Sequence, residues 1–362
     1  MTFLRTAIYI AAWLLVTACT PQKEPEQNNL YGNALTSLDV GKQVMPNQEI
    51  RLPDDHLSHP KYNVEWWYLT ANLFDQQGNQ YPLQWTLFRF SGTQSSSAWH
   101  DNDQFMAHAK LMTKSTNWFS EKFARGGVGN AGVSILNDSN KFSAFIDDWQ
   151  WLSSDIDLLP ASLSFDLTES VNVNLSMSSS GPYVLNGNNG YSAKQQDGGH
   201  ASMYYSQPFI NISGTLQLPE KVVEVSGKGW FDHEWSARLT DENTAGWDWF
   251  SLHLSNNSKL MVFRVRHTQL ADSWFGTYIS ENGQQIHLDG QDIIASERTF
   301  KLVRGRQIPL DWDIQIPKHN IQLNVTAFKE DQWNDALFSY YEGAVTVQGS
   351  HTGVGFMELT GY

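Results

Sequence analysis

Cysteine is almost absent, because the 362-residue chain has only Cys19. A single cysteine excludes any intramolecular disulfide, so the stability of the fold must come from its core. Two catalytic patterns are also missing: the Gly-x-Ser-x-Gly elbow of serine hydrolases and the His-Glu-x-x-His helix of zinc proteases. A hydrolase built from this sequence would have to use acid–base side chains alone.

Basic residues are scarce as well. The sequence has 24 Lys and Arg against 38 Asp and Glu, which gives a formal net charge of −14 at pH 7. A surface of this sign repels phosphate groups, so we expect no nucleic-acid partner. The sequence also lacks a sustained helical period, which argues against an α-helical fold.

The first 19 residues have the layout of a secretory signal. Arg5 precedes an apolar run from Ala7 to Val16, which is shorter than the ~20 residues of a transmembrane helix. Residues 16–19, Val-Thr-Ala-Cys, resemble the bacterial lipobox, in which the cysteine is lipidated and becomes the first residue of the mature chain. Thr20 follows, where an Asp would favour retention in the inner membrane. We therefore expect a lipid anchor at Cys19, at the outer membrane and facing the periplasm.

Residues 20–50 are polar, rich in Gln, Asn and Pro, and have no apolar period. This composition is typical of a flexible tether. About 310 residues follow it, which is more than one typical domain and enough for two.

Aromatic residues are abundant, with 15 Trp, 19 Phe and 13 Tyr. Aromatic side chains between Gly, Asn and Ser favour strands, and apolar and polar residues alternate in many short runs. Turn signals such as QQGN (76–79) and ENGQQ (281–285) separate these runs. The pattern predicts an all-β, antiparallel fold, either a barrel or a sandwich. The runs lie at 64–74, 82–90, 163–177, 221–231, 246–254, 259–267, 321–328 and 343–349.

The segment GWFDHEWS (229–236) combines an Asp, a His and a Glu between two tryptophans. In a strand, Trp230, Asp232 and Glu234 would share one face, while Phe231, His233 and Trp235 would share the other. The two carboxylates would perturb each other, and in an apolar pocket one could hold a proton near neutral pH and act as a general acid. Two structural alternatives stay open: the acids pair with Arg125 or Arg89 between the domains, or His233 bonds a backbone carbonyl in aromatic packing.

The segment EWWY (65–68) follows the same alternation. Glu65 and Trp67 would lie on one side, and Trp66 and Tyr68 on the other. Because both sides carry large rings, we expect this strand to be covered on both faces. Glu65 would then be a buried acid that needs a partner, and we predict His108 or Arg125. The aromatic rings could form either a ligand wall or ordinary core.

Neither the two glycine-rich segments nor the histidines predict a phosphate-binding or metal site. FARGGVGNAG (123–132) lacks the strand, helix and lysine of a phosphate loop, so it predicts a turn. Residues 181–200 predict a long Gly- and Asn-rich loop. The histidines are too dispersed to assign a metal site from the sequence, and we expect no cofactor.

Together, several segments resemble the family of carotenoid 1,2-hydratase (hydroxyneurosporene synthase) and AttH-like proteins. The resemblance implies two consecutive lipocalin-like antiparallel β-barrel domains, which we expect at 51–238 and 239–362. The resemblance also implies hydratase chemistry. Secreted bacterial members of the family are described as hydrolases, and several are lipoproteins beside transport machinery. The resembling segments are NVEWWYLTANL (63–73), MAHAKL (106–111), EKFARGGVGNAG (121–132), MYYSQPFINISGTL (203–216), GKGWFDHEWS (227–236) and YYEGAVTVQGSHTGVGFMELTGY (340–362).

These observations lead to three functional hypotheses. The first is an envelope lipoprotein that binds a hydrophobic or amphipathic small molecule as an accessory to lipid or envelope transport, because an eight-stranded barrel can enclose one small ligand. The second is a hydratase or hydrolase that uses carboxylate acid–base catalysis, and the third is a structural partner of a transporter such as an ABC permease. We expect the ligand-binding residues to be Trp66, Trp67, Tyr68, Arg125, Tyr204, Trp230 and Trp235, and the catalytic residues to be Asp232, Glu234, His233, Glu65 and His108.

Overall fold

The computed structural model describes residues 41–92, 103–195, 199–240 and 243–362. The predicted signal and Cys19 lie outside the described residues. Strands dominate the described part, where the only helices are three short 3-10 helices, so the predicted all-β fold is confirmed. None of the helices in the described residues has the length and apolarity to cross a membrane. The 3-10 helices are η1 (Asp54–His56), η2 (Gly290–Asp292) and η3 (Pro317–His319).

The strands form two antiparallel sheets. The first sheet has the order β4-β3-β2-β1-β13-β12-β9-β8-β7-β6-β5, and β10 and β11 also pair with β12. Its strands are β1 (Val64–Phe74), β2 (Gln80–Phe90), β3 (Gln104–Met112), β4 (Asn117–Arg125), β5 (Ala131–Leu136), β6 (Lys141–Ile146), β7 (Trp149–Ser153), β8 (Ala161–Thr168), β9 (Val171–Ser179), β10 (Val184–Leu185), β11 (Tyr191–Ala193), β12 (Ala201–Leu218) and β13 (Lys221–Ser236).

The second sheet has the order β17-β16-β15-β14-β23-β22-β20-β19-β18, with β21 paired to β22. Its strands follow the first sheet in the chain, since β13 ends at Ser236 and β14 begins at Thr244. They are β14 (Thr244–Leu254), β15 (Lys259–His267), β16 (Ser273–Ile279), β17 (Gln285–Asp289), β18 (Ile294–Val303), β19 (Arg306–Ile316), β20 (Ile321–Ala327), β21 (Trp333–Asn334), β22 (Tyr340–Gly349) and β23 (Gly353–Leu359).

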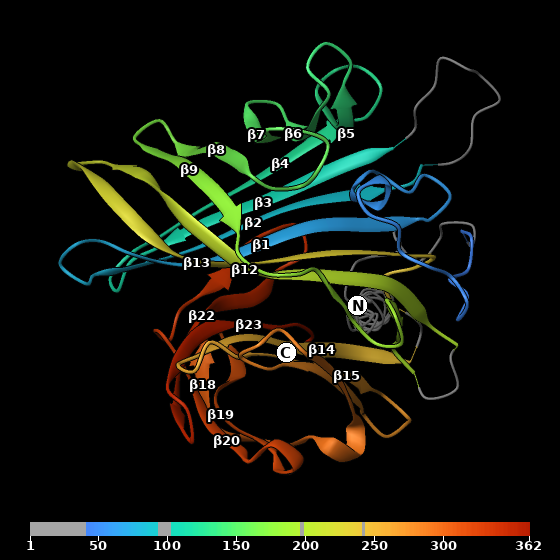
Figure 1. Cartoon of the computed structure of the whole chain (residues 1–362). Helices are drawn as coiled ribbons and strands as arrows, with labels where there is room; N and C mark the ends of the chain where they lie inside the picture. The colour runs from blue at the N-terminus through green and yellow to red at the C-terminus, as the bar shows by residue number, and fades with distance from the viewer. Residues whose placement is uncertain (1–40, 93–102, 196–198, 241–242) are drawn as a thin grey trace, which may run out of the picture.

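The two sheets lie against each other, with β1, β12 and β13 of the first facing β14, β22 and β23 of the second (Figure 1). The second sheet curls into a near-closed barrel, while the first is more open. Each sheet encloses its own apolar core, and a third apolar cluster fills the space between them. The side chains of Tyr68, Trp230 and Trp249 belong to this third cluster.

Strand alternation explains how three cores arise from two sheets. On β13, Phe231 and Trp235 point into the core of the first sheet, whereas Trp230 points toward the second sheet. On β1, Trp67 and Tyr68 divide in the same way. A strand that buries both faces has no side toward solvent, and this explains why large rings occur at successive positions in EWWY and GWFDHEWS.

A β-bulge divides the long strand β12. Its first part, up to Gln207, pairs with β10, β11 and β13, and its second part, from Ile210, pairs with β9 and β13. The pairing register shifts between Gln207 and Ile210, where Pro208 has no backbone N–H to offer a ladder. The bulge therefore allows β12 to exchange one neighbour for another and reach the space between the sheets.

Three local predictions can be compared with the structure. FARGGVGNAG is a turn between β4 and β5, as predicted. The segment 181–200 is only partly a loop, since it contains β10 and β11 paired to β12, so that prediction was wrong in part. The predicted tether runs to residue 50, yet Val44 is buried in the core of the first sheet and Gln48 donates a hydrogen bond to the Tyr62 hydroxyl.

Candidate functional site

A cavity lies between the two sheets, with a volume of about 110 Å³. This is several times the space that one water needs. Its walls come from β1, β2, β3, β12 and β13 of the first sheet and from β14, β15, β22 and β23 of the second. Its aromatic lining consists of Trp66, Tyr68, Phe88, Phe90, Tyr204, Trp247, Trp249, Phe263, Phe338 and Tyr340.

Strand register sets the arrangement of the acids in this cavity. In the pairing of β1 with β13, Trp66 lies opposite Glu234 and Tyr68 lies opposite Asp232. On the other side of β13, Tyr204 of β12 lies opposite Glu234. The predicted split of β13 is therefore confirmed: both carboxylates face the second sheet, and both have aromatic neighbours.

Asp232 is buried and accepts three hydrogen bonds. Its donors are the hydroxyl of Tyr204 at 2.8 Å, the hydroxyl of Ser206 at 2.5 Å and the indole N–H of Trp230 at 2.8 Å. Burial raises the pKa of Asp232 to about 7, against the lowering effect of these bonds, and the negative charge of Glu234 also raises it. Asp232 can thus hold a proton near neutral pH and donate it, as a general acid does.

Glu234 forms an ion pair with Lys194, whose Nζ lies 2.6 Å from Oε1 of Glu234. The side chains of both residues are buried. The Lys194 ammonium also lies over the rings of Phe263, Phe275 and Tyr204, at 4.7, 5.0 and 5.1 Å from their centroids. This pairing and the cation–π contacts hold both charges in a buried setting.

Two further acids lie on the second sheet, and neither was predicted from the sequence. Glu342 is buried and accepts a hydrogen bond from the Tyr68 hydroxyl at 2.6 Å, while Glu358 accepts one from the Trp247 indole at 2.5 Å. The two acids are directly opposite on β22 and β23. Burial raises the pKa of Glu342 to about 7 and that of Glu358 to about 8, where the charge of Glu342 adds to the effect.

A signal for these acids was present in the closing segment. Tyr341 and Leu359 belong to the core of the second sheet. Glu342 and Glu358 are their neighbours in the sequence and must therefore face the first sheet. The same alternation that located Asp232 would have located them.

His108 also lines the cavity, as part of the first sheet. Its Nδ1 lies 2.9 Å from the Tyr340 hydroxyl of the second sheet, and its Nε2 lies 2.9 Å from Oε1 of Glu121. Burial lowers the pKa of His108, against the raising effect of Glu121. The neutral imidazole therefore links the two walls.

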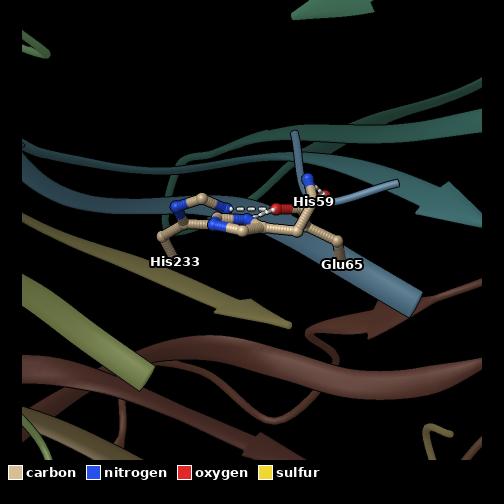
Figure 2. Close-up of side chains that lie close together, drawn as sticks. All are labelled: His59, Glu65 and His233. Atoms are coloured by element: carbon tan, nitrogen blue, oxygen red, sulfur yellow. Dashed lines mark hydrogen bonds and ion pairs between the residues drawn. The ribbon is translucent and has the colours of Figure 1, made fainter. Parts of the chain in front are cut away.

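The remaining predicted catalytic residues, Glu65 and His233, lie on the other face of β1 and β13. Figure 2 shows the imidazoles of His59 and His233 directed at the same carboxylate of Glu65. His59 Nδ1 and His233 Nε2 lie 2.6 and 2.9 Å from Oε1 of Glu65, and Arg89 donates to Oε2 at 2.9 Å. The predicted set of five catalytic residues thus divides between two places, the cavity and the interior of the first sheet.

Several predicted contacts were wrong. Glu65 does not pair with His108 or Arg125, because β1 directs it into the first sheet beside Arg89. Asp232 and Glu234 pair with neither Arg89 nor Arg125, and His233 bonds Glu65 and the Tyr205 hydroxyl instead of a backbone carbonyl.

The predicted ligand-binding residues also divide. Trp66, Tyr68 and Tyr204 line the cavity. Trp67 and Trp235 belong to the core of the first sheet, while Trp230 supports Asp232 from the apolar cluster between the sheets. Arg125 is exposed at the end of β4 and lies away from the cavity.

Sequence and structure comparisons agree on a single family. The sequence model of the AttH-like family matches residues 43–362. No curated protein matches the chain. Among solved structures, a candidate AttH protein from Nitrosomonas europaea is similar, with 27% sequence identity and a TM-score of 0.78 over 89% of this chain and 99% of that chain.

Two more distant structures share the fold. Kievitone hydratase from Nectria haematococca has 17% identity and a TM-score of 0.64 over 89% of this chain and 96% of its own. CghA has 12% identity and a TM-score of 0.53 over 88% of this chain and 93% of its own. These likenesses support the predicted fold of two lipocalin-like β-barrel domains.

Proposed function

Because the chain belongs to the AttH-like family, we propose that it binds an apolar or amphipathic small molecule in the cavity between its two sheets. The observation that carries this proposal is the composition of the cavity wall, in which many aromatic rings surround a few converging polar groups. Such a wall is typical of sites for small organic ligands. The aromatic rings would contact the apolar body of the ligand, and Asp232, Glu358 and Lys194 would bond its polar groups.

One observation favours a second function, the hydration of an isolated alkene. Asp232 is a buried carboxyl with a pKa raised to about 7 by burial, and the structurally similar kievitone hydratase is named for a hydration. In this reaction, Asp232 would give its proton to one alkene carbon. Water would form a C–O bond to the other carbon and return a proton to the Asp232 carboxylate. The sum is the addition of one water, and the acid is regenerated.

A single experiment separates binding from turnover. A form of the protein that begins after Cys19 is incubated with an envelope lipid extract in heavy-oxygen water, and bound and released molecules are identified by mass spectrometry. A molecule retained in fixed proportion to protein supports binding. Labelled product in excess of protein, absent with Asp232→Asn, supports turnover by water addition or hydrolysis. Protein that retains nothing and releases nothing contradicts both proposals.

A matched pair of variants tests whether the ligand occupies this cavity. Phe338 lines the cavity, whereas Phe123 on β4 is 55% exposed and does not. We expect Phe338→Ala to weaken binding of the identified ligand about tenfold or more, as the loss of 1.4 kcal/mol of contact would do. Phe123→Ala should leave affinity unchanged. Equal affinity in both variants would place the ligand elsewhere.

We also propose that Cys19 is lipidated and anchors the protein in the envelope, at the outer membrane and facing the periplasm. The lipobox-like residues 16–19 support this, and they lie outside the described residues. Metabolic labelling with a fatty acid should label the wild type and leave Cys19→Ser unlabelled. A wild-type protein without label would contradict the proposal. Docking on a transporter remains a prediction from the sequence.

A further inference from the structure

Among the residues that the structure describes, one group of His and carboxylate donors can converge on a single ion. His59 Nδ1, His233 Nε2 and an oxygen of Glu65 all lie within 4.8 Å of one another (Figure 2). We propose that His59, Glu65 and His233 form a binding site for a divalent transition metal, with zinc as the preferred ion. This site is separate from the cavity, because it lies on the opposite face of β1 and β13.

The donor set suits such a metal. Two imidazole nitrogens and one carboxylate oxygen are the three protein ligands of many zinc sites that keep a fourth position open for water. Zinc bonds of about 2.0–2.2 Å separate tetrahedral ligand atoms by roughly 3.4 Å. The contacts of 2.6 and 2.9 Å to Glu65 would therefore open by less than about 1 Å on loading.

Each of the three ligands is held from behind by a second polar group. Nε2 of His59 faces a carboxylate oxygen of Asp55 at 3.2 Å, and Nδ1 of His233 faces the Tyr205 hydroxyl at 3.1 Å. The second oxygen of Glu65 is held by Arg89. Outer partners of this kind fix the orientation and tautomer of metal-bound imidazoles.

The hydrogen-bond network around these residues needs more protons than neutral side chains supply. When the carboxylates are ionised and the imidazoles are neutral, the protons available for hydrogen bonds are one ring N–H on each of three histidines and one tyrosine O–H, four in total. The residues are His56, His59, His233 and Tyr205. The network has six contacts, each of which requires a proton. In order, the contacts join Asp55 to His59, His59 to Glu65, Glu65 to His233, His233 to Tyr205, Tyr205 to His56, and His56 to Asp157.

A divalent ion at Glu65 removes this deficit. It would replace the two protons between Glu65 and the imidazoles of His59 and His233, so four contacts would remain for four protons. His59 would donate to Asp55. On the other side, His233 would donate to Tyr205, Tyr205 would donate to His56, and His56 would donate to Asp157. Two positive charges would replace two protons, so the total charge of the site would be the same as in a fully protonated network.

The fixed charges also favour a cation. Glu65, Asp55, Asp103 and Asp157 carry four negative charges when ionised, and Arg89 supplies one positive charge, 2.9 Å from Glu65 and 3.2 Å from Asp103. The excess of negative charge favours a bound cation. The His59 side chain is 15% exposed, while those of Glu65 and His233 are fully buried. An ion would therefore enter at His59 and join the segment after η1 to β1 and β13.

Metal titration of the full-length protein tests the proposal. The protein is made in a Cys19→Ser background, so that the thiol binds no metal, and is stripped with a chelator. We expect one zinc per chain by elemental analysis after gel filtration. Cobalt(II) should give visible d–d absorption bands that saturate at one equivalent. Zinc should also raise the melting temperature, because it binds the folded state.

Three variants distinguish this site from other zinc-binding groups. His59→Ala should weaken zinc binding at least 100-fold, and Asp55→Asn about 10–100-fold, as is usual for an outer partner. His287→Ala is the control, since His287 forms a surface pair with Asp289 in the second sheet, and its affinity should equal that of the parent. Circular dichroism of the metal-free variants establishes that they fold.

Two results would overturn the proposal. One is a parent protein that retains no stoichiometric zinc and gives no cobalt bands. The other is a folded His59→Ala variant that binds zinc as tightly as the parent, which would place the metal elsewhere. A melting temperature that zinc raises in the parent and in Asp55→Asn, but not in His59→Ala, supports the site.

Discussion

Asp232 and Glu65 are both buried acids on adjacent strands, and their partners give them opposite character. Burial by itself favours the protonated form of both carboxyls and so acts to raise both pKa values. For Asp232 the partners are hydroxyl and indole groups, and the pKa remains high, at about 7. For Glu65, hydrogen bonds from His233 and His59 outweigh burial and lower its pKa well below the usual range. One acid therefore carries a proton near neutral pH, and the other carries a charge.

The raised pKa of Asp232 predicts a pH dependence of stability. Between about pH 4 and pH 7, the folded state holds this proton and the unfolded state releases it, so the free energy of unfolding falls as pH rises. A shift from 3.8 to about 7 corresponds to a few kcal/mol as an order of magnitude. Asp232→Asn imitates the protonated acid. It should flatten this part of the pH profile, as measured by urea unfolding at pH 5 and pH 8.

An exposed aspartate provides the control for this measurement. Asp138 lies in the turn between β5 and β6, and Asp138→Asn should unfold with the pH profile of the wild type. Glu342 and Glu358 also have raised pKa values, so some slope should persist in Asp232→Asn. A wild-type slope that Asp232→Asn leaves unchanged would contradict the assignment.

At the scale of elements, alternation in the sequence located nine of the 23 strands in the described residues, and it also gave the faces of β1 and β13. It could not find β10 and β11, because they are short and their pairing depends on the bulge in β12. Nor could it find the partners of Glu65. Arg89 lies directly opposite Glu65 on β2, and such a register is set by long-range pairing that no local pattern contains.

The close approach of β1 and β13 gives a prediction at this scale. A Cβ on Gly227 would lie 2.0 Å from the backbone oxygen of Asn72, so the two paired strands would have to separate. We expect Gly227→Ala to lower the free energy of unfolding by about 1–3 kcal/mol or more, as overpacking usually does. Urea unfolding measures the change.

Gly132 is the matched control, because it is also a strand glycine. A Cβ there would meet only the Phe145 ring, at an ordinary 3.5 Å. Gly132→Ala should therefore change the free energy of unfolding by no more than about 0.5 kcal/mol. Similar losses in the two variants would show that the contact with Asn72 is not the cause.

For the whole molecule, hydrogen bonds as well as apolar contacts join the two sheets. Tyr68 bonds Glu342, and His108 bonds Tyr340. Lys110 of β3 is fully buried and donates to two backbone oxygens, that of Gln332 just before β21 at 2.5 Å and that of Glu342 on β22 at 3.0 Å. Burial lowers the pKa of Lys110 to about 7. The relative position of the sheets is thus fixed by directional bonds, which also fix the shape of the cavity.

Removing one of these bonds should weaken the whole molecule. Lys110→Met keeps an unbranched side chain but removes both buried hydrogen bonds of the Lys110 amine, and we expect a loss of at least about 2 kcal/mol. The exposed Lys114 also donates across the sheets, to the backbone oxygen of Phe328, and Lys114→Met should cost less than about 0.5 kcal/mol. Calorimetry measures both, and equal melting temperatures of the two variants would contradict the prediction.

The two-faced strand β13 also limits how this protein can change by insertion or deletion. Its residues 230–235 face in turn the space between the two sheets, where the cavity lies, and the interior of the first sheet. Adding or removing one residue within this stretch would exchange the two faces. The same change would therefore turn Asp232 and Glu234 away from the cavity and turn His233 away from Glu65. Variation in length is therefore confined to the ends of β13, and the chemistry on its two sides can be altered only by substitution.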